Sequence, residues 1–376
     1  MRPALPLITL LMITGCAVSE HPKAQASETK RDVQVKIAGP DRPRVIVTSD
    51  FPPLNVIPVK ACKPTDPKPQ CSDPDDVQSM VRFLLYANDF DVEALIASSG
   101  TFANVANKQS ILDMLDKYDE VDENLRRHDP RYPTAAQLRA VTWQGEDGSI
   151  GTADFAGGKY RAIDTLVGSD HDTEASNAII AAIDKPDPGP VWILAWGGSR
   201  EAAQAIWKVN HSRSPAEAAA FMSKIRLYII AKQDYTADWL LDTYPDLFII
   251  LSEKNYMGMF WNMPGADTIV SDADWMETHI RQGHGALGAA YPRSGWDPSV
   301  PGVWEGDTPA FLYVLSGVRG VSDPEKPDMG SWGGKFVRPD ASRNHWFDDP
   351  AGAETVYKWR PQVQADFAER TDWMRP

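Results

Sequence analysis

From residue 43 onward, short runs of β-branched and other apolar residues alternate with stretches whose apolar residues recur every third or fourth position. The first pattern is typical of buried strands and the second of amphipathic helices. Their alternation predicts an α/β fold with a mostly parallel, Rossmann-like sheet covered by helices. The predicted strands are 44–50, 94–97, 191–194, 227–230 and 247–251, and the predicted helices are 77–86, 111–118, 175–183, 201–207 and 307–315.

No internal repeat or linker interrupts residues 43–350, so we predict one domain there and a C-terminal helical extension over 351–376. The chain has 52 acidic and 38 basic residues, which gives a formal net charge of -14. A nucleic-acid backbone would be repelled by that charge, so we expect no nucleic-acid polymer as a partner.

The N-terminus has the pattern of an export signal. Arg2 precedes an apolar run that ends at Ile13, which is shorter than the roughly 20 residues that span a membrane. The following Thr14-Gly15-Cys16 resembles the lipobox of bacterial lipoproteins, which implies that 1–15 are removed and that Cys16 carries the lipid. The polar residues 16–42 then form a flexible tether to the outer membrane. The alternative is cleavage after Ala26, which would release a soluble periplasmic protein.

Export makes a disulfide the expected state of the remaining cysteines, Cys62 and Cys71, although two free thiols stay an alternative. Both cysteines lie in an insertion over residues 51–74 that contains seven prolines. A second segment, 318–350, is rich in Gly, Trp and Asp and shows no strand or helix period. Long irregular segments in compact domains are commonly functional.

Acidic residues recur where predicted strands end or the following helices begin. Asp50 ends the first strand, Asp75 and Asp76 begin the next helix, and Asp307 begins a late helix, while Trp196 ends the strand that starts at 191. Ligands of open parallel sheets bind beyond the carboxyl ends of the strands. Carboxylates that converge there repel one another unless they are protonated or bind a cation, and oxygen ligands select Ca²⁺ or Mg²⁺. Taken singly, the aspartates also fit ordinary helix caps, and Trp196 fits a core position.

Several stretches together resemble one bacterial family, the nucleoside-hydrolase-like family once labelled cellulose-binding. The stretches are Thr48-Ser49-Asp50, Pro74-Asp75-Asp76, 81–88, 193–198, 283–288, 305–309 and 330–334. That family is similar to the metal-dependent inosine-uridine nucleoside hydrolases, whose α/β sheet carries an aspartate cluster at its carboxyl edge. The resemblance implies the same fold and a divalent cation, Ca²⁺ or else Mg²⁺.

The resemblance also implies the ligands and their roles. Asp50, Asp75, Asp76 and Asp307 would bind the cation through carboxylates, and Trp196 through its main-chain carbonyl. Asp50 would in addition act as the general base, taking a proton from water bound to the cation. The water would attack an anomeric carbon and invert its configuration.

Further residues are expected to contact the substrate. Thr101 occupies the position of a substrate-binding Asn in nucleoside hydrolases, and Glu174 opens a predicted helix, where it fits a cap equally well. Trp304 and Trp332 offer flat faces that suit a sugar or a nucleobase. His284, which lies between two glycines, is the candidate leaving-group acid or else a structural loop histidine.

This chain departs from the family in two places. Nucleoside hydrolases carry a His before the last metal Asp, where this chain has Gly306. The first Asp and the Asp pair lie close together in the family, whereas 24 residues separate Asp50 from Asp75 here. A Cys62–Cys71 disulfide could close that insertion into a side loop and let the aspartates meet. Otherwise Asp73 could replace Asp50, or the site could be inactive.

The sequence therefore predicts a divalent-metal-dependent hydrolase of N- or O-glycosidic bonds that acts on a nucleoside, a small sugar or an oligosaccharide. The alternative is a non-catalytic carbohydrate-binding lipoprotein that uses the same crevice. The four aspartates favour the enzyme, because binding a neutral glycan does not require them. A nicotinamide-dependent enzyme is excluded, because no Gly-x-Gly-x-x-Gly follows the first strand.

Overall fold

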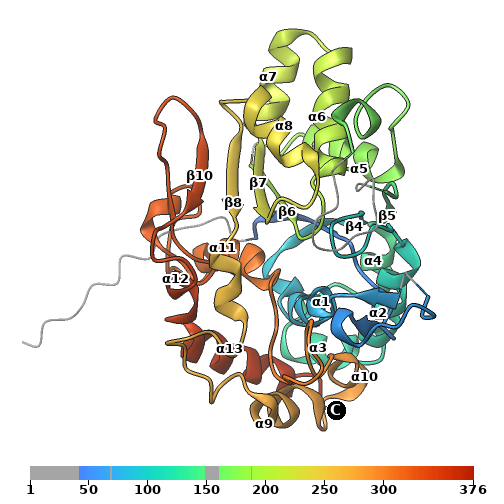
Figure 1. Cartoon of the computed structure of the whole chain (residues 1–376), viewed down its shortest axis with the longest axis vertical. Helices are drawn as coiled ribbons and strands as arrows, with labels where there is room; N and C mark the ends of the chain where they lie inside the picture. The colour runs from blue at the N-terminus through green and yellow to red at the C-terminus, as the bar shows by residue number, and fades with distance from the viewer. Residues whose placement is uncertain (1–41, 68–69, 149–160, 188) are drawn as a thin grey trace, which may run out of the picture. The chain divides into compact units, whose positions relative to one another are not determined.

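The predicted α/β sheet is present at the centre of the fold (Figure 1). The computed structural model describes residues 42–67, 70–148, 161–187 and 189–376. Within them, an eight-stranded sheet has the order β5-β4-β1-β6-β7-β8-β10-β9. Its strands are β1 (Arg44–Ser49), β4 (Asp91–Ala97), β5 (Thr142–Gln144), β6 (Val191–Ala195), β7 (Ile225–Ile230), β8 (Phe248–Ser252), β9 (Phe336–Val337) and β10 (His345–Asp348).

Every neighbouring pair in this sheet is parallel except β9 and β10, which are antiparallel. The chain leaves β1 on one side to form β4 and β5, and then continues on the other side of β1 with β6, β7 and β8. The strand order therefore reverses between β1 and β6. In open α/β sheets the crevice for a ligand lies at such a reversal, beyond the carboxyl ends of the strands.

Alternate residues of a strand point to opposite faces of the sheet, so apolar side chains of the buried strands lie on both faces. Helices cover both of these faces. In β1, Val45 and Val47 belong to one apolar core and Ile46 to the other. The first core contains side chains of α1 (Asp75–Leu85), α2 (Lys108–Asp119), α11 (Thr308–Val318) and α13 (Arg360–Asp372). The second contains side chains of α5 (Glu174–Asp184), α6 (Arg200–Ser212), α7 (Pro215–Ser223) and α8 (Tyr235–Thr243).

Shorter helices complete the fold. The α-helices are α3 (Asp122–His128), α4 (Ala135–Ala140), α9 (Ala273–Met276), α10 (Gly285–Ala290) and α12 (Glu354–Tyr357). The 3-10 helices are η3 (Ala87–Asp89), η4 (Ile163–Thr165), η5 (Asn255–Met259) and η7 (Pro327–Met329), and η6 (Glu277–Arg281) is a π-helix. The segment 351–376 is helical through α12 and α13, and Val363 and Phe367 of α13 lie in the first core.

The structure differs from the prediction in segment 318–350, where β9 and β10 extend the sheet. His345 pairs with Ile249 of β8, and Phe347 pairs with Val337 of β9. These strands are only four and two residues long. They are too short for a period of two to show in the sequence, so the pairing of β10 with β8 and of β9 with β10 decides their structure.

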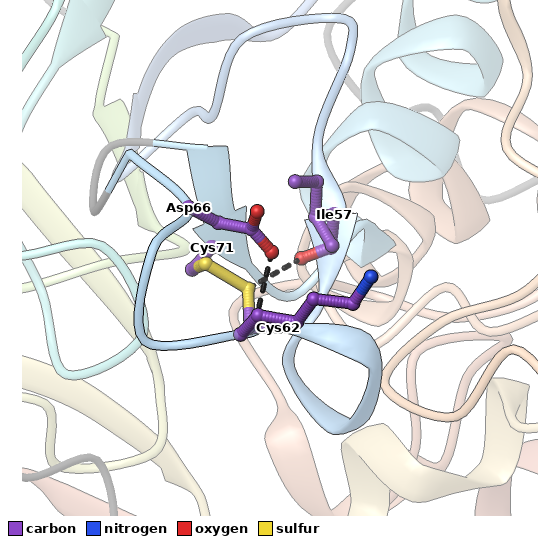
Figure 2. Close-up of a disulfide and its surroundings, with 5 residues drawn as sticks. Ile57, Cys62, Asp66 and Cys71 are labelled. Atoms are coloured by element: carbon purple, nitrogen blue, oxygen red, sulfur yellow. Dashed lines mark hydrogen bonds between the residues drawn. A yellow bond between two sulfur atoms is a disulfide. The ribbon is translucent and has the colours of Figure 1, made fainter.

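The insertion after β1 forms a small element of its own. It contains β2 (Ile57–Pro58), η1 (Val59–Ala61) and β3 (Cys71–Ser72), and β2 and β3 pair in parallel. A disulfide joins Cys62 to Cys71, whose Cα atoms lie 5.8 Å apart (Figure 2). The predicted disulfide is confirmed, and it closes residues 62–71 of the insertion into a loop. At the two ends of the insertion, the Ser49 hydroxyl of β1 donates a hydrogen bond to Asp76 of α1, so the end of the strand lies beside the start of the helix.

The predicted signal over 1–15, the lipidated Cys16 and nearly all of the tether 16–42 lie outside the described residues. Among the helices that the structure describes, none combines the length and the apolar character needed to cross a membrane.

Candidate active site

Three carboxylates from two distant helix starts meet at the carboxyl edge of the sheet. Asp75 and Asp76 are the first residues of α1, and Asp307 directly precedes α11. Because α1 and α11 pack against each other, these side chains lie together, with one oxygen of each within 4.8 Å of the others. The sequence prediction that these three aspartates converge therefore agrees with the structure.

The alternative interpretation of each of these aspartates was a helix cap. The N-cap residue of α1 is Pro74, which makes no side-chain capping hydrogen bond, while Asp75 Oδ1 accepts a hydrogen bond from the Asp76 amide at 3.0 Å. Asp307 is the N-cap residue of α11, but its side chain makes no capping hydrogen bond. Its Oδ2 atom is buried and has no hydrogen-bond partner among the described residues. A buried carboxylate oxygen without a donor is costly, and either a proton or a cation would relieve that cost.

The cluster is electrostatically unfavourable in the absence of a cation. Burial, and then the repulsion of neighbouring carboxylates, raises the pKa of Asp75 and of Asp307 well above the ordinary value. Burial raises the pKa of Asp76 to about 6, although the hydroxyl of Ser49 donates a hydrogen bond to its Oδ1 atom. Burial and the charge of Asp76 raise the pKa of Asp73 to about 7. Proton uptake or a bound cation would relieve this repulsion.

Asp50 lies beneath the cluster, at the end of β1, and is 1% exposed. Its Oδ2 atom accepts a hydrogen bond from the Ala103 amide at 2.8 Å. A Cβ atom added to Gly100 or Gly197 would come within 2.5 or 2.7 Å of its carboxylate oxygens. Burial, and then the charge of Asp76, raises the pKa of Asp50 well above the ordinary value. Asp50 therefore joins the cluster electrostatically while backbone encloses its carboxylate.

Gly306 has a local explanation in this geometry. A Cβ atom at this position would collide with Asp75 Oδ2. A histidine before Asp307 would therefore displace a carboxylate of the cluster, and the close approach of the backbone requires glycine.

The carboxylates line a cavity of about 390 Å³ whose other lining residues include several aromatic side chains. Its acidic lining residues are Asp73, Asp75, Asp76, Asp297 and Asp307, and its aromatic ones are Phe102, Trp196, Tyr256, Phe260, Trp296 and Trp304. The Phe260 and Trp304 rings are 5.0 Å apart between centroids, and those of Phe102 and Trp296 are 6.1 Å apart. Flat apolar faces above carboxylates suit a ring that carries hydroxyl groups.

Gln233 connects two of the predicted residues. Its side-chain amide donates a hydrogen bond to the main-chain carbonyl of Trp196, and its Oε1 atom accepts one from the Thr101 amide at 3.2 Å. The Thr101 hydroxyl donates to the Gln233 carbonyl at 2.8 Å. Trp196 and Gln233 line the cavity. Thr101 is not among the described lining residues, and it contacts Gln233 instead. The Trp196 carbonyl keeps a second lone pair for the predicted metal contact.

The sequence analysis missed Gln233 and most of the aromatic wall. Gln233 follows β7 at the same edge of the sheet as Asp50, so its position after a strand was an available signal. Ala231, also in the cavity lining, has a φ of 56°, which is uncommon for a residue other than glycine. Such conformations gather at functional sites, where the surrounding fold holds them.

Three predicted residues lie away from the cavity, and here the structure corrects the prediction. His284 is 1% exposed, and its Nε2 atom lies 3.1 Å from Asp372 and 3.0 Å from Arg375. The side chain of Glu174 is 60% exposed and faces Lys108. Trp332 is buried, and its amide donates to the Ser316 hydroxyl. Of the predicted substrate residues, only Trp304 lines the cavity.

The comparisons with known proteins agree with this fold. The family described as cellulose-binding Sde182, nucleoside hydrolase-like domain, matches residues 65–336, a range that includes Asp73, Asp75, Asp76 and Asp307 but not Asp50. A structure of a nucleoside hydrolase-related protein from Saccharophagus degradans, described as associated with carbohydrate metabolism, is 32% identical with a TM-score of 0.69. The alignment covers 89% of this chain and 72% of that one. Among curated proteins, none matches the chain.

Two further solved structures are more distant. The effector protein XOO4466 and the type III effector protein XopQ, the latter complexed with adenosine diphosphate ribose, are each 12% identical with a TM-score of 0.47. The alignments cover 90% of this chain and 95% and 96% of those chains, and at this similarity they carry no argument about function. The family match and the 32% identical structure show that this chain belongs to the family of cellulose-binding Sde182, nucleoside hydrolase-like domains.

Proposed function

We propose that this protein is a divalent-cation-dependent hydrolase of N- or O-glycosidic bonds in nucleosides or small glycans. The observation that carries the proposal is the convergence of Asp75, Asp76 and Asp307 within 4.8 Å, at the base of an aromatic cavity. The family itself is nucleoside-hydrolase-like, and a related structure is associated with carbohydrate metabolism.

The residues present fit a hard cation. They offer carboxylate oxygens, which Ca²⁺ and Mg²⁺ prefer over the nitrogen and sulfur ligands typical of zinc. The buried Oδ2 atom of Asp307 lacks a donor among the described residues, and burial, followed by the repulsion of neighbouring carboxylates, raises the pKa of Asp307 well above its ordinary value. Asp75, Asp76 and Asp307 would hold the cation, with the Trp196 carbonyl as the further predicted ligand. When bound, the cation would make a water molecule more acidic and orient sugar hydroxyls.

The structure favours Asp73 over Asp50 as the general base. A base must reach a water molecule in the cavity within hydrogen-bond distance. Asp73 lines the cavity, whereas Asp50 is 1% exposed and is absent from the described residues of the lining. We therefore assign proton acceptance to Asp73, which was the alternative in the sequence analysis, and keep Asp50 as the buried carboxylate beneath the cluster. The attack on an anomeric carbon would invert its configuration.

The other lining residues would bind the substrate. Trp304 and Phe260 would stack on its ring and shield the reacting bond from bulk water. No histidine is among the described residues that line the cavity, so we propose no histidine as the acid that protonates the leaving group.

A screen by mass spectrometry tests the proposal. Nucleosides and oligosaccharides are incubated with the protein and Ca²⁺, beside a sample treated with EDTA and the Asp75→Asn/Asp307→Asn variant. We expect cleavage of at least one glycosidic bond in the first sample only. Cleavage that survives chelation would exclude the cation mechanism. Saturable binding of a glycan without cleavage would favour the carbohydrate-binding alternative.

We also propose that the protein is exported and anchored to the outer membrane through Cys16. The Cys62–Cys71 disulfide supports export, because such bonds persist in oxidising compartments. Metabolic labelling with a palmitate analogue tests the anchor. We expect label in the wild-type protein and none in Cys16→Ala, and equal label in both would contradict the proposal.

A further inference from the structure

The disulfide-closed insertion forms part of the cavity wall. Its residue Lys60, in η1, lines the cavity together with Trp296 and Asp297 from the loop that follows α10. The Lys60 amide donates a hydrogen bond to the Trp296 carbonyl at 3.3 Å. Its ammonium group lies 2.7 Å from Asp297 Oδ2. One residue of the insertion therefore holds two neighbouring residues of the opposite loop, through its main chain and its side chain.

Asp297 carries a negative charge in this contact. Hydrogen bonds from Lys60 and from Ser299 lower the pKa of Asp297 to about 2, so its carboxylate is ionised at neutral pH. The Ser299 amide and hydroxyl donate to Asp297 Oδ1 at 2.9 and 2.6 Å, which leaves Oδ2 for Lys60. The loop that carries Trp296 thus presents a fixed anion to the insertion.

The disulfide connects this wall to the carboxylate cluster. Cys62 lies two residues after Lys60, and Cys71 lies two residues before Asp73. The pairing of Ile57 with Cys71 holds the same two segments beside each other. Because the two ends are cross-linked, a displacement of η1 would also move the start of the acidic segment, and the wall keeps a fixed position relative to Asp73.

We propose that the insertion is the specificity-determining wall of the cavity and that Lys60 is the positioning residue that sets Trp296 against the substrate ring. The ring is a pyranose or a nucleobase, because the flat face of Trp296 beside Phe102 suits either. This inference rests on the proposed hydrolase. A positioning residue acts on substrate binding, so its loss raises KM and leaves kcat nearly unchanged.

Steady-state kinetics of Lys60→Met test the proposal, with Lys63→Met as the matched control. Lys63 is an exposed lysine of the same insertion that does not line the cavity. On a substrate found in the screen, we expect Lys60→Met to raise KM about two- to fivefold with kcat nearly unchanged. We expect Lys60→Arg to recover most of the wild-type KM, because the ion pair can re-form. Equal KM values for Lys60→Met and Lys63→Met would overturn the proposal.

A second measurement separates this inference from the proposed function. Amide hydrogen exchange over residues 294–300 reports the coupling of the two loops in the protein without substrate. We expect faster exchange there in Lys60→Met and in Cys62→Ser/Cys71→Ser than in Lys63→Met. Unchanged exchange in both variants would overturn the coupling even if the wild type is active. If the wild type binds and cleaves neither nucleosides nor glycans, the proposed function fails, whatever the exchange rates show.

Discussion

At the scale of single residues, exposure distinguishes carboxylates that the sequence presents as equivalent. Asp50 and Asp73 both interact electrostatically with Asp76. Asp50 has backbone packed against both of its oxygens, since Gly100 and Gly197 leave no room for a Cβ atom. Asp73 lines the cavity. Only a carboxylate that reaches the cavity can accept a proton from a water molecule there, and for this reason we propose Asp73 rather than Asp50 as the general base.

The variant Asp73→Asn is expected to lower kcat by about 10²- to 10⁴-fold, the usual contribution of a general base. Asp50→Asn should retain kcat within roughly tenfold, because its amide oxygen can still accept the Ala103 hydrogen bond. Asp66→Asn, in the same insertion but outside the cavity lining, is the control. Turnover numbers under saturating Ca²⁺ measure the effect. An inactive Asp50→Asn beside an active Asp73→Asn would restore the original assignment.

At the scale of elements, one buried ion pair joins the last turn of α1 to the segment that precedes α11. Arg82 of α1 lies 2.5 Å from Glu305, which precedes Asp307 by two residues, and both side chains are 0% exposed. The Tyr291 hydroxyl donates to Glu305 at 2.6 Å, and the Arg82 guanidinium lies 3.7 Å above the Phe367 ring of α13. The pair therefore fixes how α1 meets the segment before α11.

Replacing Arg82 by Met should cost about 3–5 kcal/mol of unfolding free energy, because Glu305 would remain buried and unpaired. The double variant Arg82→Met/Glu305→Gln should recover part of this loss, since no uncompensated charge remains. Arg127→Met is the control, because its partner Glu123 is 75% exposed; exposed pairs contribute only about 0–1 kcal/mol. Urea denaturation measures all three. Similar losses for Arg82→Met and Arg127→Met would contradict the role of the pair.

At the scale of the whole molecule, the carboxylate cluster couples stability to pH and to cations. The raised pKa values of Asp73, about 7, and Asp76, about 6, mean that the native chain binds more protons than the unfolded chain between about pH 4 and 7. The carboxylates of the cluster therefore destabilise the native state least at a pH below the pKa of an aspartate in the unfolded chain. The free energy of unfolding falls as the pH rises through the raised pKa values of Asp76 and Asp73 in the folded chain. A bound cation would remove this penalty, because it stabilises the charged carboxylates of the native state.

In EDTA, the midpoint of thermal unfolding is expected to be lower at pH 8 than at pH 5 by roughly 5 °C or more. Ca²⁺ should remove most of this difference at pH 8. The Asp75→Asn/Asp307→Asn variant should show a smaller pH dependence in EDTA and a weaker response to Ca²⁺, which separates the cluster from the general effect of net charge. Calorimetry measures the midpoints. A wild-type midpoint that is independent of both pH and Ca²⁺ would argue against a cation site.

The sequence alone determined the features that depend on local patterns. The strands and helices around Val45, Leu194 and Leu315 follow from periodicities within a few residues, and the disulfide follows from two cysteines in a chain that is predicted to be exported. The positions of Asp75, Asp76 and Asp307 at the carboxyl edge follow from strand direction. Each of these properties is carried by neighbours in the chain, so it can be predicted before the fold is known.

Only the tertiary structure decided which side chains face the cavity. The flanking glycines of His284 predicted a loop, but its contacts with Asp372 and Arg375 place it away from the site. Asp73 lines the cavity where the sequence predicted Asp50, and the Lys60 amide contacts the Trp296 carbonyl, more than 230 residues later in the chain. Exposure and contact between distant residues arise from packing of whole elements, and no local pattern in the sequence records how those elements meet.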